Sequence, residues 1–457
     1  MPTPEEIQQL RQLDRDHLLH PNVVLGEFEQ AGGTIIVGGE GATVRDIDGR
    51  EYIDAIGALW LANVGYGRPE LAAAAAAQMR QLPFWSLFYG WSNVPAIRLA
   101  AEMARIAPEG FNHAFFTSGG SESNETSIKF ARLFHVRRGH PSKQIVIGLQ
   151  RAYHGVSYGA MTATGLERVR EGYAPLVGAF EHIPGAYCYR CPFGKTYPEC
   201  QVDCADELER AITRLGAGNV AAFIAEPIQG VGGVITPPPG YYEKVREICD
   251  RHDVLWIADE VICGFGRTGK LFGIENWTVR PDLISCAKGI TSGYLPLGAS
   301  LVSDKVYEAL RGDGHQSLNH GFTYSGHPVA AAVALENIRI LEREGLPARA
   351  AALGESMRAQ LLALSNPHIG EVRGKGLLIG VELVRDRGTR EAVELAPAVE
   401  LACRARGVIL RALGGNIISI SPPLVITEAQ AARVVAVLDE VVRQVCGASG
   451  RAGQAAQ

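Results

Sequence analysis

Several features that mark other classes of protein are missing from this sequence. No apolar run approaches the roughly 18 to 20 residues of a transmembrane helix, and the first residues, MPTPEEIQQLRQLDRDH, are polar and acidic, unlike a signal peptide. Lys and Arg form no block, and the net charge is −5. We therefore expect a cytoplasmic protein that binds neither membranes nor nucleic acid.

Cysteines are also few, and most are not arranged as a disulfide framework. Five of the nine are scattered through apolar or helical stretches, at positions 249, 263, 286, 403 and 446, as is typical of reduced, packed thiols. With 47% hydrophobic and 20% charged residues, the composition is that of a globular protein. The length of 457 residues allows two or three domains.

The other four cysteines cluster in YCYRCPFGKTYPECQVDC, at Cys188, Cys191, Cys200 and Cys204. Paired thiolates at such spacing can bind zinc and staple a loop. The middle spacing is short for a zinc site, however, and we take free or partly oxidised thiols as the default interpretation.

Hydrophobic patterning divides the chain into two kinds of region. Over residues 61–325, short β-rich runs such as HAFFT, VAAFIAEPI and GASLV alternate with helical stretches, which is typical of an α/β domain with a mostly parallel sheet. Residues 326–446 predict helices over 328–344, 346–364 and 428–446 with strands between them, a smaller α+β domain. We expect residues 1–60 to join this smaller domain and residues 447–457 to form a disordered tail.

One of the apolar runs ends in a lysine. In DLISCAKGIT, residues 282–291, Lys288 directly follows a predicted buried strand and precedes a glycine. Lysine is seldom buried unless its charge is compensated, so this position requires a chemical explanation.

Two more motifs follow predicted strands. In FFTSGGSESNETSIKF, Gly120 and Ser121 open a helix whose free N–H groups can bind an anion, although such a turn can equally be a capped helix start. In VLWIADEVICGFGRTG, Asp259 and Glu260 end an apolar strand, where a buried carboxylate needs a partner. A helix cap or a salt bridge to Arg267 is the alternative to a functional role.

One cofactor accounts for all three motifs. Pyridoxal 5'-phosphate has a phosphate for the glycine-rich turn, an aldehyde for Lys288 and a protonated ring nitrogen for Asp259. Burial lowers the pKa of a lysine, so that its neutral amine can react with the aldehyde and later move a proton.

The sequence resembles the class III aminotransferases, of the ω-amino acid or amine:pyruvate type, within the fold-type I pyridoxal-phosphate family. The resemblance extends from about residue 20 to residue 440. It rests on six motifs in the family's order: TSGGSESNETSIK, AYHGVSYG, EPIQGVGG, DEVICGFGRTG, CAKGITSGYLPLGA and HGFTYSGHP.

This resemblance implies roles for individual residues. Lys288 corresponds to the Schiff-base lysine and Asp259 to the partner of the ring nitrogen. The other implied cofactor-binding residues are Gly120 and Ser121 at the phosphate, Tyr153 and Val261 on the two ring faces, His154, Glu226, and Thr323 from the neighbouring subunit.

The resemblance also implies a substrate site, lined by Leu59, Trp60, Phe88, Tyr153 and Val231, with Arg411 as a mobile arginine for a carboxylate. Core packing of the aromatic residues and a surface position for Arg411 are the alternatives. Ile262 stands where ornithine- and γ-aminobutyrate-type relatives carry glutamine, which favours the amine:pyruvate branch. Asn22 and the bulkier Val231 depart from the family's common residues and alter the size or polarity of the site.

We therefore expect an enzyme that moves an amino group from an amine or ω-amino acid to pyruvate by a ping-pong route through pyridoxamine phosphate. It would be a homodimer with shared active sites, or a tetramer. The alternatives are a diamine, β-alanine or taurine transaminase, and a lyase or aminomutase on the same scaffold. A non-catalytic binding protein is disfavoured because Lys288, Asp259 and Tyr153 are all present.

Overall fold

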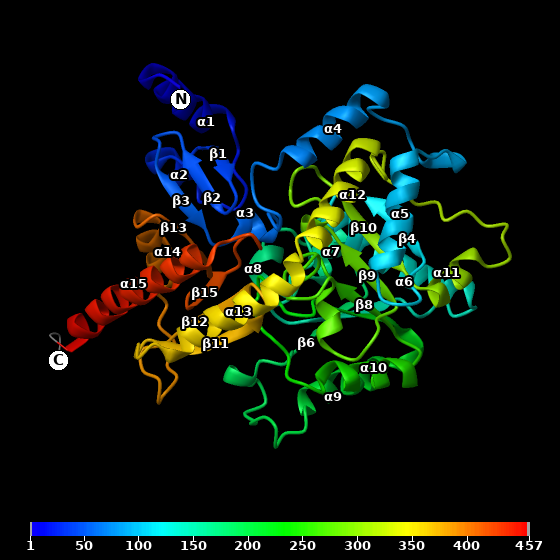
Figure 1. Ribbon diagram of the computed structural model, residues 1–457. Coiled ribbons are helices and arrows are strands. Elements are labelled where there is room, and N and C mark those ends of the chain that lie inside the picture. The colour runs from blue at the N-terminus through cyan, green and yellow to red at the C-terminus, as the bar shows by residue number, and fades with distance from the viewer. Residues whose placement is uncertain (1, 455–457) are drawn as a thin grey trace.

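A seven-stranded sheet forms the centre of the larger part of the molecule (Figure 1). The structure is a computed structural model that describes the backbone of residues 2–454 and the side chains of residues 2–447. The strand order is β4-β10-β9-β8-β7-β5-β6. Its strands are β4 (His113–Thr117), β5 (Ile145–Leu149), β6 (Phe180–Ile183), β7 (Val220–Ala225), β8 (Leu255–Asp259), β9 (Leu283–Cys286) and β10 (Gly298–Val302).

Five neighbouring strands, β6, β5, β7, β8 and β9, run parallel to one another. Strand β10 runs antiparallel to its two neighbours, β9 and β4. All residues of β7 and β8 are buried, as expected of central parallel strands covered on both faces. The helices of this part are α4 (Pro69–Gln81), α5 (Val94–Ile106), α6 (Gly120–Arg137), α7 (Tyr158–Ala163), α8 (Glu167–Arg170), α9 (Asp206–Leu215), α10 (Tyr241–Arg251) and α11 (Asp304–Arg311). The predicted α/β class is confirmed.

Two four-stranded sheets make up the smaller part, on the side of the molecule where both ends of the chain lie (Figure 1). One contains β1 (Ile36–Glu40), β2 (Thr43–Asp46), β3 (Glu51–Asp54) and β13 (Val408–Ile409), and the other β11 (Ile369–Lys375), β12 (Leu378–Leu383), β15 (Ile417–Ile420) and β14 (Arg411–Leu413). The parallel pairing of β13 with β3 joins the beginning of the chain to its C-terminal region.

The remaining helices are α1 (Pro4–His17), α2 (Leu25–Ala31), α3 (Gly57–Trp60), α12 (Pro328–Arg343), α13 (Leu346–Ala363), α14 (Ala396–Ala405) and α15 (Glu428–Gln454). Although α12 follows the boundary expected at residue 326, it packs against α4 and α5 of the larger part. Of the tail expected over 447–457, the backbone continues in α15 to Gln454, and residues 455–457 lie outside the described residues.

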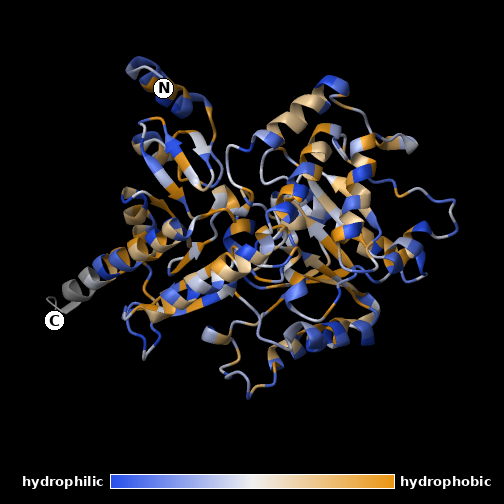
Figure 2. Ribbon diagram, in the orientation of Figure 1, coloured by the Kyte–Doolittle hydropathy of each residue, from blue (hydrophilic) through white to orange (hydrophobic). Residues whose placement is uncertain are grey.

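Burial follows the sequence pattern. Figure 2 shows hydrophobic residues concentrated in the sheets and on helix sides that face them, whereas α1 is mostly hydrophilic and has no buried residue. Within residues 2–454, no helix is long and apolar enough to cross a membrane.

Candidate active site

The predicted reactive residues meet at one edge of the central sheet. Asp259 ends β8, Glu226 follows β7, and Lys288 lies two residues beyond β9. Because these three parallel strands are neighbours, their carboxyl ends lie side by side, which is where open α/β sheets bind their ligands.

Lys288 combines a left-handed backbone with an unpaired amine. Its φ is 47°, and its Nζ lies 5.9 Å from the centre of the Trp60 ring. Among the described residues, no hydrogen bond or ion pair engages this Nζ. Burial lowers the pKa of Lys288, while the negative charges of Asp259 and Glu226 oppose the shift. The site thus contains an amine that is easier to deprotonate than an exposed lysine.

Asp259 is only 2% exposed and is held on both oxygens. Its Oδ2 accepts hydrogen bonds from His154 Nδ1 and Asn124 Nδ2, each at 2.7 Å, and its Oδ1 accepts one from Val261 N at 3.0 Å. An ionised carboxylate only accepts, so the proton of the histidine ring lies on Nδ1 when the ring is neutral. The carboxylate is therefore fixed in place with a proton donor behind it.

The salt bridge considered between the Asp259–Glu260 pair and Arg267 is not formed. The fully buried Arg267 donates instead to Leu377 O, Pro422 O and Asn63 Oδ1. Glu260 accepts from Gly273 N and Ile274 N, each at 2.7 Å, and burial raises its pKa to about 8. The salt bridge does not form because Arg267 donates to two carbonyls and to Asn63, while Glu260 accepts from the first two N–H groups of the 3-10 helix Gly273–Asn276. The other alternative, a helix cap, therefore describes Glu260.

The glycine-rich turn packs directly against two other predicted motifs. A Cβ on Gly120 would lie 2.8 Å from Val261 Cγ1, and a Cβ on Gly155 would lie 2.3 Å from Ser121 Oγ. Val156 N donates to Ser121 Oγ at 3.2 Å. The turn opens α6, whose first N–H groups lack partners within the helix, so it offers an anion site beside Val261.

Glu226 connects Tyr153 to the loop that carries Val231. Its Oε1 accepts a hydrogen bond from Tyr153 N at 3.0 Å and its Oε2 accepts one from Gly230 N at 2.8 Å. Burial raises the pKa of Glu226 to about 7 and also raises that of the Tyr153 hydroxyl. The partly buried Val231 follows Gly230 directly.

Trp60 brings Arg411 to the same site. The Arg411 guanidinium carbon lies 5.4 Å from the centre of the Trp60 ring, which Lys288 also faces. In the described part of the chain, Arg411 Nε is buried without a hydrogen-bond partner. This arrangement leaves a cation available to a carboxylate near the lysine. Leu59, in contrast, is 43% exposed.

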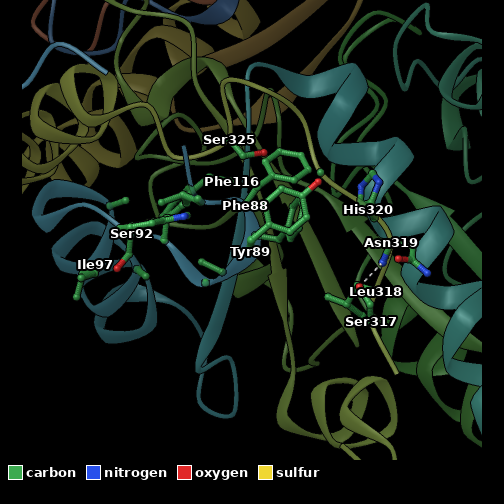
Figure 3. Close-up of a pocket in the computed structure, with 18 residues that line it drawn as sticks. Phe88, Tyr89, Ser92, Ile97, Phe116, Ser317, Leu318, Asn319, His320 and Ser325 are labelled. Carbon is green, nitrogen blue, oxygen red and sulfur yellow. Dashed lines mark hydrogen bonds between the residues drawn. The ribbon is translucent and has the colours of Figure 1, made fainter. Parts of the chain in front are cut away.

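Phe88 and Thr323 belong to a different surface of the chain. Phe88 lines an open pocket of about 880 Å³ between residues 87–100 and 317–325 (Figure 3). Thr323 is exposed at the end of this second segment. Within the described residues, neither side chain hydrogen-bonds or stacks with Lys288 or Ser121, so the roles predicted for both stay predictions.

The residues that do meet suit pyridoxal phosphate. A free amine, a buried carboxylate backed by a histidine, and a helix start too tight for a side chain at Gly120 match its aldehyde, ring nitrogen and phosphate. Sequence reasoning missed Asn124, the second donor to Asp259. Its position four residues after Gly120, on the same face of α6, is the signal that could have identified it.

The four clustered cysteines surround one small cavity of about 10 Å³. Cys188 is exposed, and Cys191, Cys200 and Cys204 are partly buried, all as free thiols. Within the described residues, no group of three or more histidine, cysteine or carboxylate side chains is placed to hold a metal. Both zinc binding and free or partly oxidised thiols therefore stay predictions from the sequence.

The sheet order and the residues at its edge define a fold-type I transferase. The model of the family "Aminotransferase class-III" matches residues 29–442, and the chain belongs to this family of aminotransferases.

Individual relatives agree with this assignment. The putrescine–pyruvate aminotransferase of Pseudomonas aeruginosa is 45% identical over 426 residues, which cover 92% of each chain. The crystal structure of an (S)-enantioselective ω-transaminase from Thermomicrobium roseum superposes with a TM-score of 0.92 at 43% identity, covering 96% of this chain and 98% of that one. An ω-transaminase of Pseudomonas jessenii in complex with PMP gives a TM-score of 0.92 at 37% identity, covering 95% and 99%.

Proposed function

We propose that this aminotransferase uses pyridoxal 5'-phosphate to move an amino group from an amine or ω-amino acid to pyruvate. The observation that carries the proposal is the unpaired Lys288 amine beside a buried Asp259 whose partners are His154 and Asn124. The name of the Pseudomonas aeruginosa relative, which specifies pyruvate, supports this acceptor.

Each cofactor-binding residue would hold one part of the molecule. Gly120 and Ser121 would bind the phosphate, Tyr153 and Val261 would cover the two ring faces, and Asp259 would hold a proton at the ring nitrogen. When bound, the cofactor supplies an aldehyde for the amine substrate and a ring that takes up the electron pair released at the substrate carbon.

Lys288 would move the reacting proton. Burial lowers the pKa of Lys288 and so makes the amine easier to deprotonate. Nζ would then remove the proton from the substrate carbon that bears nitrogen and return it later in the transfer. Trp60, which lies against this amine, would exclude water from it and form one wall for the substrate.

Arg411 would allow one site to serve two unlike substrates. Its guanidinium would bind the carboxylate of pyruvate and lie against Trp60 when an uncharged amine is present. Leu59 and Val231 would complete the walls, and Phe88, which lies on another surface of this chain, would do so for the site of the neighbouring subunit. A diamine donor is the second candidate, favoured by the putrescine named for the Pseudomonas aeruginosa relative.

We also propose a homodimer with shared active sites. Large apolar side chains around the pocket of Figure 3 are unusually exposed: Trp85 44%, Tyr89 95%, Trp91 60% and Tyr324 60%. Such a patch marks a protein interface. Thr323 lies next to it and would reach the phosphate of the neighbouring subunit. A tetramer and a cytoplasmic location stay predictions from the sequence.

Product analysis tests the function. Purified protein would be incubated with pyruvate and either 1-phenylethylamine or putrescine, and alanine would be measured by chromatography. Alanine should form with at least one donor and should be absent with Lys288→Ala, which should remain folded by circular dichroism. Alanine formation by Lys288→Ala at the wild-type rate would refute the proposal.

A further inference from the structure

A buried polar cluster lies between the smaller part of the molecule and the loop of residues 229–235, which we call the Val231 loop. At its centre, Glu382 of β12 accepts hydrogen bonds from Arg373 Nη1 at 2.6 Å and from Tyr187 Oη and Arg190 Nε. Glu382 is 0% exposed and Arg373 8% exposed. A charge pair this deeply buried is costly unless its hydrogen bonds are well made.

Besides Glu382, Glu371 and Tyr187, the Arg373 guanidinium binds the Val231 loop. Its Nη2 and Nε both donate to Gly233 O, at 2.6 and 3.0 Å. The neighbouring carbonyl, Gly232 O, accepts from Arg151 Nε at 3.1 Å. Both arginines also lie over the ring of Tyr187, at 4.9 and 5.3 Å. Two consecutive carbonyls of the loop are therefore held by cations.

The loop has little room to move while these contacts exist. A Cβ on Gly233, whose φ is +126°, would lie 2.6 Å from Ile417 Cδ1 of β15, and a Cβ on Gly380 of β12 would lie 2.9 Å from Val234 Cβ. Val234 itself adopts a φ of 53°, which is uncommon for a β-branched residue. Such a conformation persists only where the surroundings impose it.

The other side of the loop reaches the active site. Gly230 N is held by Glu226, the carboxylate that also holds Tyr153 N. Val231 therefore lies between Gly230, whose N–H is held by Glu226 at the active site, and Gly233, whose carbonyl is held by Arg373. We propose that Arg373 is a positioning residue that fixes the Val231 loop against the smaller part of the molecule and thereby sets the size of amine that the site accepts; this rests on the proposed function.

Hydrogen exchange measures the loop without reference to activity. The holoenzyme would be compared with Arg373→Met, Arg373→Lys and, as a matched control, Arg385→Met. Arg385 is an exposed arginine of the same region whose side chain pairs with Glu391 and, among the described residues, with no other. The hydrogen-bonded amides of residues 229–235 should exchange about tenfold faster in Arg373→Met, less so in Arg373→Lys, and unchanged in the control.

Amine selectivity tests the second half of the proposal. The ratio of kcat/KM for 1-phenylethylamine to that for isopropylamine should rise about fivefold in Arg373→Met, because a more mobile Val231 loop can move aside for the larger amine. Simple loss of folded enzyme would lower both values and leave the ratio unchanged. Unchanged exchange would overturn the positioning role, and faster exchange with an unchanged ratio would overturn the control of amine size.

Tyr187→Phe covers the case in which Arg373→Met does not fold. It keeps every charge and removes one hydrogen bond to Glu382, so exchange in the Val231 loop should rise about threefold. No change in either Tyr187→Phe or Arg373→Lys would overturn the proposal. Failure of the proposed function would look different, because the wild-type protein itself would form no alanine.

Discussion

The amine of Lys288 has carboxylates nearby but, among the described residues, no hydrogen-bond partner. These carboxylates are the buried Asp259 and Glu226, and the amine faces the ring of Trp60. Burial of the amine lowers its pKa. A structural lysine would be paired, and an unpaired one at the carboxyl edge of a parallel sheet is suited to covalent chemistry.

Removing Arg411 should affect the two halves of the reaction unequally. In Arg411→Ala, the half reaction with pyruvate should slow by about 10- to 100-fold, because a charged hydrogen-bonding group for the carboxylate is lost. The half reaction with 1-phenylethylamine should change by less than about threefold. Stopped-flow absorbance of each half reaction measures both. Equal losses would contradict the mobile-arginine role.

Glu260 should make stability depend on pH. Its pKa is raised by burial from 4.5 to about 8, so the folded protein binds the proton more tightly than the unfolded chain. The resulting stabilisation is complete below about pH 4.5 and is lost as pH rises through about 8. Glu260→Gln cannot ionise and therefore removes this dependence.

Thermal unfolding of both proteins between pH 5 and pH 8 measures the effect. The free energy of unfolding of the wild type, relative to Glu260→Gln, should fall as pH rises, by at most about 1.4 kcal/mol per pH unit. Glu226 is present in both proteins, so its own titration cancels in the difference. Parallel curves for the two proteins would contradict the assignment.

The sequence identified individual residues best where a residue type conflicts with its surroundings. A lysine after a buried strand and a carboxylate at the end of another are conflicts of this kind, and the structure places Lys288 and Asp259 at one sheet edge. The partners of Asp259 were harder to identify. Asn124 and His154 come from α6 and from the segment after β5, and only the assembled sheet brings them to the same oxygen.

At the scale of elements, the start of α6 depends more on Gly120 than on Gly119. A Cβ at position 120 would meet Val261 at 2.8 Å, whereas one at position 119 would meet nothing within 4 Å. Gly120→Ala should therefore weaken binding of pyridoxal phosphate by about tenfold or more. Gly119→Ala, whose φ of 179° suits any residue, should change it by less than about threefold.

Fluorescence titration of cofactor-free protein with pyridoxal phosphate measures both affinities. Because the clash is with Val261, the double variant Gly120→Ala/Val261→Ala should recover part of the lost affinity. Similar effects of the two single glycine variants would show that close packing at this turn does not matter.

Elements with a clear periodicity were predicted closely. The run HAFFT is β4 without a change of boundary, and the predicted helices over 328–344 and 346–364 are α12 and α13 to within one residue at either end. One of the strands expected between the helices of residues 326–446 is β15, which ends at Ile420 because Pro422 and Pro423 follow. Strand β6 was not predicted, since FEHI is short and half polar.

The polar clusters between distant elements could not be predicted. Arg373 and Glu382 belong to adjacent strands, but Tyr187, which contacts both, and Gly233, which accepts from Arg373, are about 140 to 200 residues away in sequence. No local pattern encodes such a contact. The same limit applies to Arg267, whose true partners lie in three separate segments.

At the scale of the whole molecule, the exposed aromatic patch predicts a dimer. Sedimentation or light scattering should give twice the mass of the 49.1 kDa chain. Tyr89→Asp and Trp91→Asp place a charge in the proposed interface and should shift the population toward monomer with a loss of activity. A monomeric, fully active wild-type protein would contradict shared active sites.

The central claim is that one site performs both halves of an amine:pyruvate transamination. Visible absorption spectra of the purified protein, recorded before and after 1-phenylethylamine or putrescine and again after pyruvate, test it most directly. We predict that the visible absorption band of the cofactor bound to Lys288 disappears when the amine is added and returns when pyruvate is added. The Lys288→Ala variant should not show this cycle. A protein that binds the cofactor but shows no change with either amine or with pyruvate would contradict the claim.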